Sequence, residues 1–157
     1  LLNAATFPEI KGRTLSDDKI IIPSKSETQL LILGFDMNSA DAMNSWVKKL
    51  NLTPSSSISW VQIPIIGSVP PFVDGFIKGG MKNTVTGNVQ DHYFPYFGGK
   101  KNDILMSIHG SETLSDKVTP FLVIVVPTAN IAFSEQMMAT TDNVKTVLST
   151  LTDLTKP

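Results

Sequence analysis

The chain has 157 residues, a net charge of −1 and no cysteine, which fits one domain whose core needs neither disulfides nor a structural metal. The missing cysteines exclude thiol catalysis, disulfide exchange, iron–sulfur clusters and cysteine-ligated zinc. The nearly balanced charge, without a run of Lys or Arg, gives no signature of nucleic-acid binding. The longest apolar run, Phe121 to Val126, is far shorter than the ~20 residues of a membrane-spanning helix, so we expect no membrane span.

The sequence starts at Leu1 rather than with Met. This start indicates either a trimmed chain or a mature exported protein whose signal peptide has been removed. We favour export to the periplasm or another space outside the cytoplasm.

The first part of the chain reads as a hairpin, a strand and a helix. Residues 7–15 and 19–23 flank a turn signal at Asp17-Asp18, which predicts a pair of strands. Residues 30–35 form a continuous apolar run, the pattern of a strand covered on both faces. Apolar residues then recur at helical spacing from Ala42 to Leu50, with Asn38 and Ser39 as the expected helix caps.

A second strand and helix follow. Residues 58–66 predict a buried strand, with Pro64 near its end. Pro70-Pro71 opens a helix that we expect to end at Gly79-Gly80. Two strand–helix units in series predict a parallel βαβ core with a right-handed crossover.

The rest of the chain contains an insertion and a closing unit. Residues 82–117 form an irregular insertion and bridge, in which residues 104–108 fit either a strand or a helix. Residues 121–126 predict a third buried strand, and residues 127–130 turn the chain into an antiparallel partner. The last predicted element along the chain is a helix capped by Thr141-Asp142.

This order resembles the thioredoxin-like superfamily, across roughly residues 30–154 of a single domain that spans 1–157. The most specific match is Thr119-Pro120 followed by Phe121-Leu122-Val123-Ile124. Residues 1–28, with Phe7-Pro8 and Gly12-Arg13-Thr14-Leu15, are similar to the N-terminal extension of the peroxiredoxin-like branch. The dipeptides Phe7-Pro8, Ser45-Trp46 and Tyr93-Phe94 also resemble the mitochondrial ATP synthase assembly factor family and its bacterial relatives.

The resemblance implies an α/β fold with a central mixed sheet flanked by helices, an N-terminal strand extension and an aromatic insertion. It also implies a cis bond between Thr119 and Pro120. In that fold, the residue before the proline can offer its backbone N–H and C=O to an extended peptide. We therefore expect a groove for a protein or peptide, formed by Asn38, Ser39, Ala40, Met43, Thr119 and Pro120.

In thioredoxins the reactive cysteine pair lies at the start of the first core helix, where the helix dipole lowers the thiol pKa. The resemblance puts that pair at about Ala40 and Met43, both chemically inert. Asn38, Ser39 and Ala40 occupy the region of a peroxidatic cysteine. We expect neither thiol oxidoreductase nor peroxidase activity.

Other chemistry has weaker support in the sequence. Ser39 lacks an evident base, and Asp36 reads as a turn or capping carboxylate. His92 and His109 lack metal-ligand spacing, so we expect no metal and no cofactor. The sequence from Gly98 to Lys101 lacks the spacing of a phosphate-binding loop and reads as a turn.

The aromatic residues of the insertion allow two interpretations: they pack over the sheet, or they form a docking patch. They are Tyr93, Phe94, Tyr96 and Phe97. Overall, we expect a redox-inactive module that binds another protein, with an assembly or chaperone-like role. A non-thiol enzyme using Asp36, Ser39 or His92, and a degenerate structural or oligomerising domain, remain alternatives.

Overall fold

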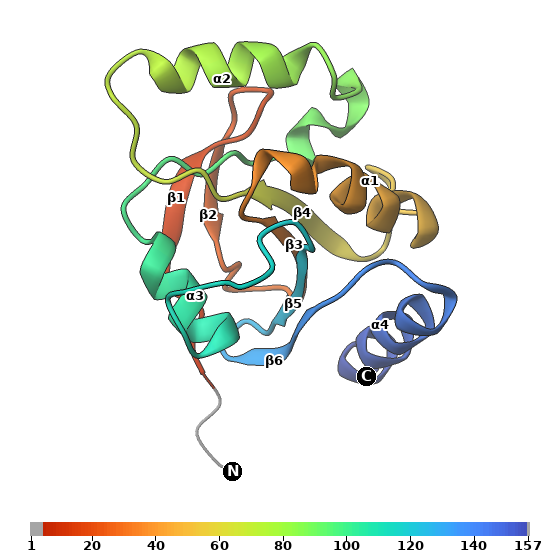
Figure 1. Cartoon of the computed structure of the whole chain (residues 1–157). Helices are drawn as coiled ribbons and strands as arrows, with labels where there is room; N and C mark the ends of the chain where they lie inside the picture. The colour runs from red at the N-terminus through yellow and green to blue at the C-terminus, as the bar shows by residue number, and fades with distance from the viewer. Residues whose placement is uncertain (1–4, 157) are drawn as a thin grey trace.

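A four-stranded sheet in the order β4-β3-β5-β6 forms the centre of the computed structural model, which describes residues 5–156 (Figure 1). Its strands are β3 (Gln29–Gly34), β4 (Ser59–Pro64), β5 (Phe121–Val125) and β6 (Ile131–Gln136). The helices are α1 (Ala40–Lys49), α2 (Val73–Lys82), α3 (Lys101–His109) and α4 (Thr141–Leu154), with 3₁₀ turns η1 (Met37–Ser39) and η2 (Gly87–His92). A separate antiparallel hairpin joins β1 (Ile10–Arg13) and β2 (Lys19–Ile22).

The sheet is mixed, as expected. Strand β3 pairs in parallel with β4, with Leu31 opposite Val61, and α1 makes the crossover between them. Strand β5 runs antiparallel to both β3 and β6. Every residue of β3 and β5 is buried, which explains why their sequences are continuous apolar runs.

Alternate residues of the strands belong to two apolar layers. The layer beneath the hairpin and α3 contains Leu31, Leu33 and Val123. The layer beneath α1 and α4 contains Leu30, Ile32 and Leu122. In Figure 1, α3 and α4 lie at different sides of the sheet, so both faces of the central strands are covered.

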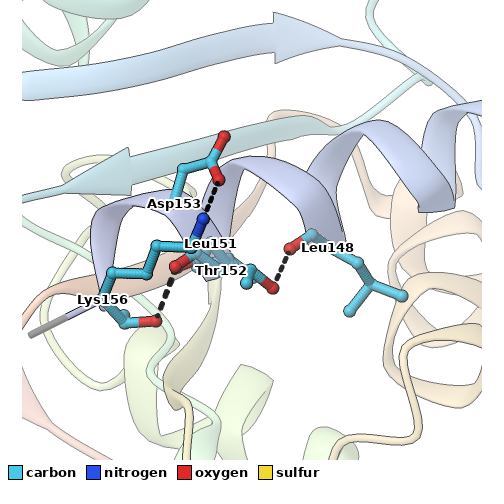
Figure 2. Close-up of polar contacts among 6 residues, drawn as sticks. Leu148, Leu151, Thr152, Asp153 and Lys156 are labelled. Atoms are coloured by element: carbon cyan, nitrogen blue, oxygen red, sulfur yellow. Dashed lines mark hydrogen bonds and ion pairs between the residues drawn. The ribbon is translucent and has the colours of Figure 1, made fainter.

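Helix α4 closes the second layer with Val147 and Leu151. Thr140 caps its start by accepting a hydrogen bond from Asn143 N. Figure 2 shows its last turns, where Thr152 Oγ1 donates to Leu148 O at 2.8 Å and Lys156 pairs with Asp153 at 3.4 Å. These contacts are on the exposed side of the helix. Helix α4 is therefore attached to the sheet by its apolar residues.

Two expectations about the elements need correction, and one open alternative is decided. Helix α2 continues through Gly79-Gly80 to Lys82. Residues 104–108 belong to helix α3. The insertion is not irregular throughout, because Phe94 N donates to Gln62 O and Tyr96 N to Pro64 O, which extends the edge of β4 in parallel.

Within residues 5–156, no helix has both the length and the apolar character needed to cross a membrane. Leu1, on which the expectation of export rests, lies outside the described residues.

Candidate functional site

The candidate site begins where β3 ends and α1 starts. Asp36, rather than Asn38 or Ser39, caps this turn, because its Oδ1 accepts a hydrogen bond from Asn38 N at 2.8 Å. Ser39 is fully buried, and its Oγ donates to Lys117 O at 3.3 Å. Ser39 stands at the N-cap position of α1, as expected, but its side chain makes no capping hydrogen bond and instead ties α1 to the loop before β5.

The two positions at which the resemblance puts the redox cysteines differ in exposure. Ala40 is exposed in the first turn of α1, whereas Met43 is buried in the layer beneath α1. Met43 packs against Gly34, where an added Cβ would overlap Met43 Sδ. Neither side chain offers a nucleophile or a titratable group.

The loop of residues 116–119 is fastened by its own side chains. Asp116 Oδ1 accepts hydrogen bonds from Val118 N at 3.0 Å and Thr119 N at 3.1 Å. Gln136 Nε2 donates to Thr119 O at 2.9 Å. Hydrogen bonds from the Thr119 side chain and from the Thr119 and Val118 N–H groups lower the pKa of Asp116 below its ordinary value. The N–H and C=O of Thr119 are thus both occupied within the chain.

The bond between Thr119 and Pro120 is trans, so the prediction of a cis bond is wrong. The only cis peptide bond in residues 5–156 joins Ile22 and Pro23. Pro120 O accepts from Met137 N at 3.1 Å, which continues the β5–β6 pairing by one residue. Trans is the default geometry of X–Pro bonds.

An apolar groove of about 630 Å³ lies beside the start of α1, over the carboxyl ends of β3 and β4. One wall comes from η1 and the sheet, and the other from α2. Its apolar lining consists of Phe35, Met37, Pro64, Ile65, Ile66, Phe76, Ile77 and Met81. Asp36 and Lys101 line it too, and both also line a neighbouring cavity of about 600 Å³.

The rim of this groove exposes large apolar side chains. Met37 is 89% exposed and Phe76 is 87% exposed. Helix α2 buries none of its residues, although apolar side chains follow one another along its face. The Pro70-Pro71 signal predicted this helix, but sequence reasoning missed that its apolar face stays open.

The aromatic residues of the insertion are core residues. Tyr93, Phe94 and Tyr96 are 7%, 1% and 4% exposed, and Phe97 is half-buried. Burial raises the pKa of Tyr93. The hypothesis of an exposed docking patch made by these rings is therefore wrong, and the packing interpretation holds.

The two histidines do not form a joint site. His92 Nδ1 donates to Trp60 O at 2.8 Å, since a carbonyl can only accept, and its ring stacks on Trp60 with centroids 4.3 Å apart. His109 instead lies edge-to-face against Phe121 at 5.6 Å. In the part of the chain that the structure describes, no three His, Asp or Glu residues are arranged to hold a metal ion. His92 also forms no hydrogen bond with Ser39 or Asp36, the other residues of the enzyme alternative.

No protein-family model and no curated protein matches the chain. Solved structures do match. BsSco, a member of the Sco family of cytochrome c oxidase assembly proteins, has a TM-score of 0.65 and 13% identity, with 98% of this chain and 96% of that chain covered. The exposed lipoprotein thioredoxin Etrx1 of Streptococcus pneumoniae has a TM-score of 0.58 and 9% identity, with 90% and 98% covered. A thiol:disulfide interchange protein from Chlorobium tepidum has a TM-score of 0.55 and 12% identity, with 96% and 98% covered.

These likenesses concern the fold. The chain has the expected thioredoxin-like fold, a mixed sheet flanked by helices, and it has no cysteine with which to perform thiol chemistry.

Proposed function

We propose that this thioredoxin-like protein is a redox-inactive binding module that holds an apolar segment of another protein in the groove between η1 and α2. The observation that carries the proposal is the open groove of about 630 Å³ with Met37 and Phe76 almost fully exposed at its rim. Large apolar side chains gathered at one concave place mark interaction surfaces.

The position of the groove supports the proposal. It lies at the carboxyl ends of the two parallel strands, the edge where open α/β sheets bind their ligands. Asn38, one of the residues expected to line the binding groove, is exposed beside Met37.

The route of binding differs from strand addition at Thr119. A peptide that pairs with the N–H of Thr119 must displace Asp116, and Gln136 already occupies one acceptor position of the Thr119 C=O. The groove next to α2 needs no such displacement. We therefore assign partner binding to side-chain contacts with apolar walls.

The chemistry of the lining defines the partner segment. Met37 and Met81 can adapt to different apolar shapes, because the unbranched thioether side chain is flexible and polarisable. The charges that line the groove are one acid and one base, Asp36 and Lys101, which give no single-signed field. The partner segment is therefore apolar and nearly uncharged, as is the surface that unassembled or unfolded proteins expose, and the role is assembly or chaperone-like.

A peptide selection tests this proposal. A displayed library of random 12-residue peptides is selected on the wild-type chain, and the enriched peptides are then measured by fluorescence anisotropy. We expect peptides with several apolar residues and little net charge. Met37→Asp and Phe76→Asp should each weaken their binding by at least tenfold, since each puts a charge on the apolar rim.

Phe72→Asp is the matched control. Phe72 is also 89% exposed and adjoins α2, but it does not line the groove, so its replacement should leave peptide affinity unchanged. Circular dichroism checks that each variant keeps its fold. Equal binding to wild type and to both rim variants, or selection of peptides without apolar residues, would contradict the proposal.

A further inference from the structure

A cavity of about 460 Å³ lies on the α1 side of the sheet and touches the groove described above at Thr84, which lines both. Its floor is formed by Gln62 of β4 and by Tyr93, whose backbones pair side by side. Helix α1 forms one wall, and residues 84–89, which follow α2 and lie next to α1 in Figure 1, form another. The volume is in the range of small-molecule sites, roughly 300–1,000 Å³.

Gln62 is a polar residue on a buried face of the sheet. Its neighbours Val61 and Ile63 belong to the layer beneath the hairpin and α3, so Gln62 faces α1, since successive strand residues point to opposite faces. It is 3% exposed, and its Nε2 donates to Asn44 Oδ1 of α1 at 3.1 Å. Burying an amide is unfavourable unless its polar atoms are paired, and an apolar side chain would avoid that cost. A glutamine at this position therefore indicates a polar role on the cavity side.

Tyr93 brings a hydroxyl group to the same cavity. Within residues 5–156, every fully buried side-chain nitrogen or oxygen has a hydrogen-bond partner. Tyr93 Oη and Gln62 Oε1 have no partner among these residues, although the two side chains are 7% and 3% exposed. Both atoms therefore reach open space, and the cavity that both residues line is that space. Burial raises the pKa of Tyr93, so its hydroxyl stays protonated and is able to donate.

The polar atoms that face the cavity include both donors and an acceptor. Asn44 uses its Oδ1 for Gln62, which leaves its Nδ2 as a donor, and Gln62 Oε1 is an acceptor. A neutral amide matches this set, because its N–H donates to Gln62 Oε1 while its C=O accepts from Tyr93 Oη or Asn44 Nδ2. Among the described residues, none that lines the cavity is Asp or Glu, so a cation finds no counter-charge there.

The cavity also has apolar lining, from Val47, Leu52, Val85 and Val89. Water alone would pair with the polar atoms but leave these methyl groups hydrated, whereas a ligand with an apolar part would cover them. We propose that the cavity binds a small uncharged molecule that has an amide group on an apolar body. The amide contacts Gln62, Tyr93 and Asn44, and the body packs against the aliphatic side chains.

Benzamide is the probe, and benzylamine and benzoate are controls of nearly the same size. Of the three, benzamide alone has an uncharged donor next to an acceptor. In an NMR titration of the ¹⁵N-labelled chain, the side-chain NH₂ signals of Gln62 and Asn44 should shift and saturate with benzamide. Benzylamine and benzoate should bind at least tenfold more weakly. Met37→Asp, which alters the peptide groove, should leave benzamide affinity unchanged, so this proposal and the proposed function can fail separately.

Two tyrosine variants separate binding from stability. Tyr93→Phe removes a hydroxyl that has no partner within residues 5–156, so benzamide affinity should fall at least fivefold while the melting temperature does not fall. Tyr96→Phe is the control, because Tyr96 lies outside the cavity lining and its Oη accepts from Lys100 N at 3.1 Å. That variant should melt at a lower temperature but keep its affinity for benzamide.

Three results would overturn the proposal. The first is the absence of shifts at Gln62 and Asn44 up to the highest soluble concentration of benzamide, which would mean that the cavity holds water only. The second is equal affinity for benzamide and benzoate. The third is an affinity for benzamide that Tyr93→Phe leaves unchanged.

Discussion

Replacing Gly34 by alanine tests how closely the start of α1 packs on β3. Gly34 is the last residue of β3, and its added Cβ would overlap Met43 Sδ and lie 3.2 Å from Ser39 Cβ. Extra methyl groups in a packed core cost about 1–3 kcal/mol. For a chain of this length, each kcal/mol lowers the melting temperature by roughly 2–4 °C, so we expect Gly34→Ala to melt about 2–12 °C lower.

A double-mutant cycle identifies Met43 as the cause. Met43→Ala alone should cost about 2–5 kcal/mol, because Met43 is fully buried and the truncation leaves a cavity. In the double variant, the methyl group added at position 34 and the shortened side chain at position 43 no longer collide, and the new methyl fills part of the cavity. The two effects should therefore be less than additive, by about 0.5–3 kcal/mol.

Urea unfolding followed by tryptophan fluorescence measures all four corners of this cycle. The control is Gly75→Ala, since no atom lies within 4 Å of a Cβ added there and the residue is in helix α2. That variant should be more stable by about 1 kcal/mol. Additivity of Gly34→Ala and Met43→Ala within about 0.5 kcal/mol would refute the close packing of α1 on the end of β3.

Three further outcomes are expected. Gly79→Ala, also open to solvent in α2, should raise the helical content measured by circular dichroism, and a loss would contradict the exposed placement of α2. Hydrogen bonds to Thr119 lower the pKa of Asp116, so these bonds hold the loop at any pH above the ordinary carboxyl pKa and are lost as the pH falls through the lowered pKa. The amide chemical shifts of Thr119 should report this loss, and Asp116→Asn should abolish the pH dependence. The wild type should not reduce insulin. The double variant Ala40→Cys, Met43→Cys should form a disulfide that dithiothreitol reduces, and a pair that stays as free thiols would count against the placement of these residues at the helix start.

The sequence was sufficient for the central strands and for their succession along the chain. The runs at residues 30–35 and 121–126 are apolar without alternation, because helices cover both faces of β3 and β5. The helix between β3 and β4 was predictable because its buried side chains, among them Met43 and Trp46, recur at helical spacing. These elements could be predicted from local patterns because each buried position needs an apolar side chain of its own.

The parts of the site that depend on distant residues could not be read in this way. The occupied backbone of Thr119 depends on Gln136, and the buried position of Ser39 depends on its bond to Lys117 O. Nothing near residues 93–96 in the sequence indicates that their backbone pairs with β4 and so buries the rings. The apolar face of α2 resembles that of any packed helix, and only the fold shows that no element within residues 5–156 buries it.

Methionine-methyl NMR tests the central claim, that an apolar segment binds between η1 and α2, most directly. The chain has six methionines; Met37 and Met81 line the groove, while Met106 and Met138 are 48% and 47% exposed away from it. During titration with a selected apolar peptide, the methyl signals of Met37 and Met81 should shift and saturate together, while those of Met106 and Met138 stay in place. Shifts confined to Met106 or Met138, with Met37 and Met81 unchanged, would contradict the account.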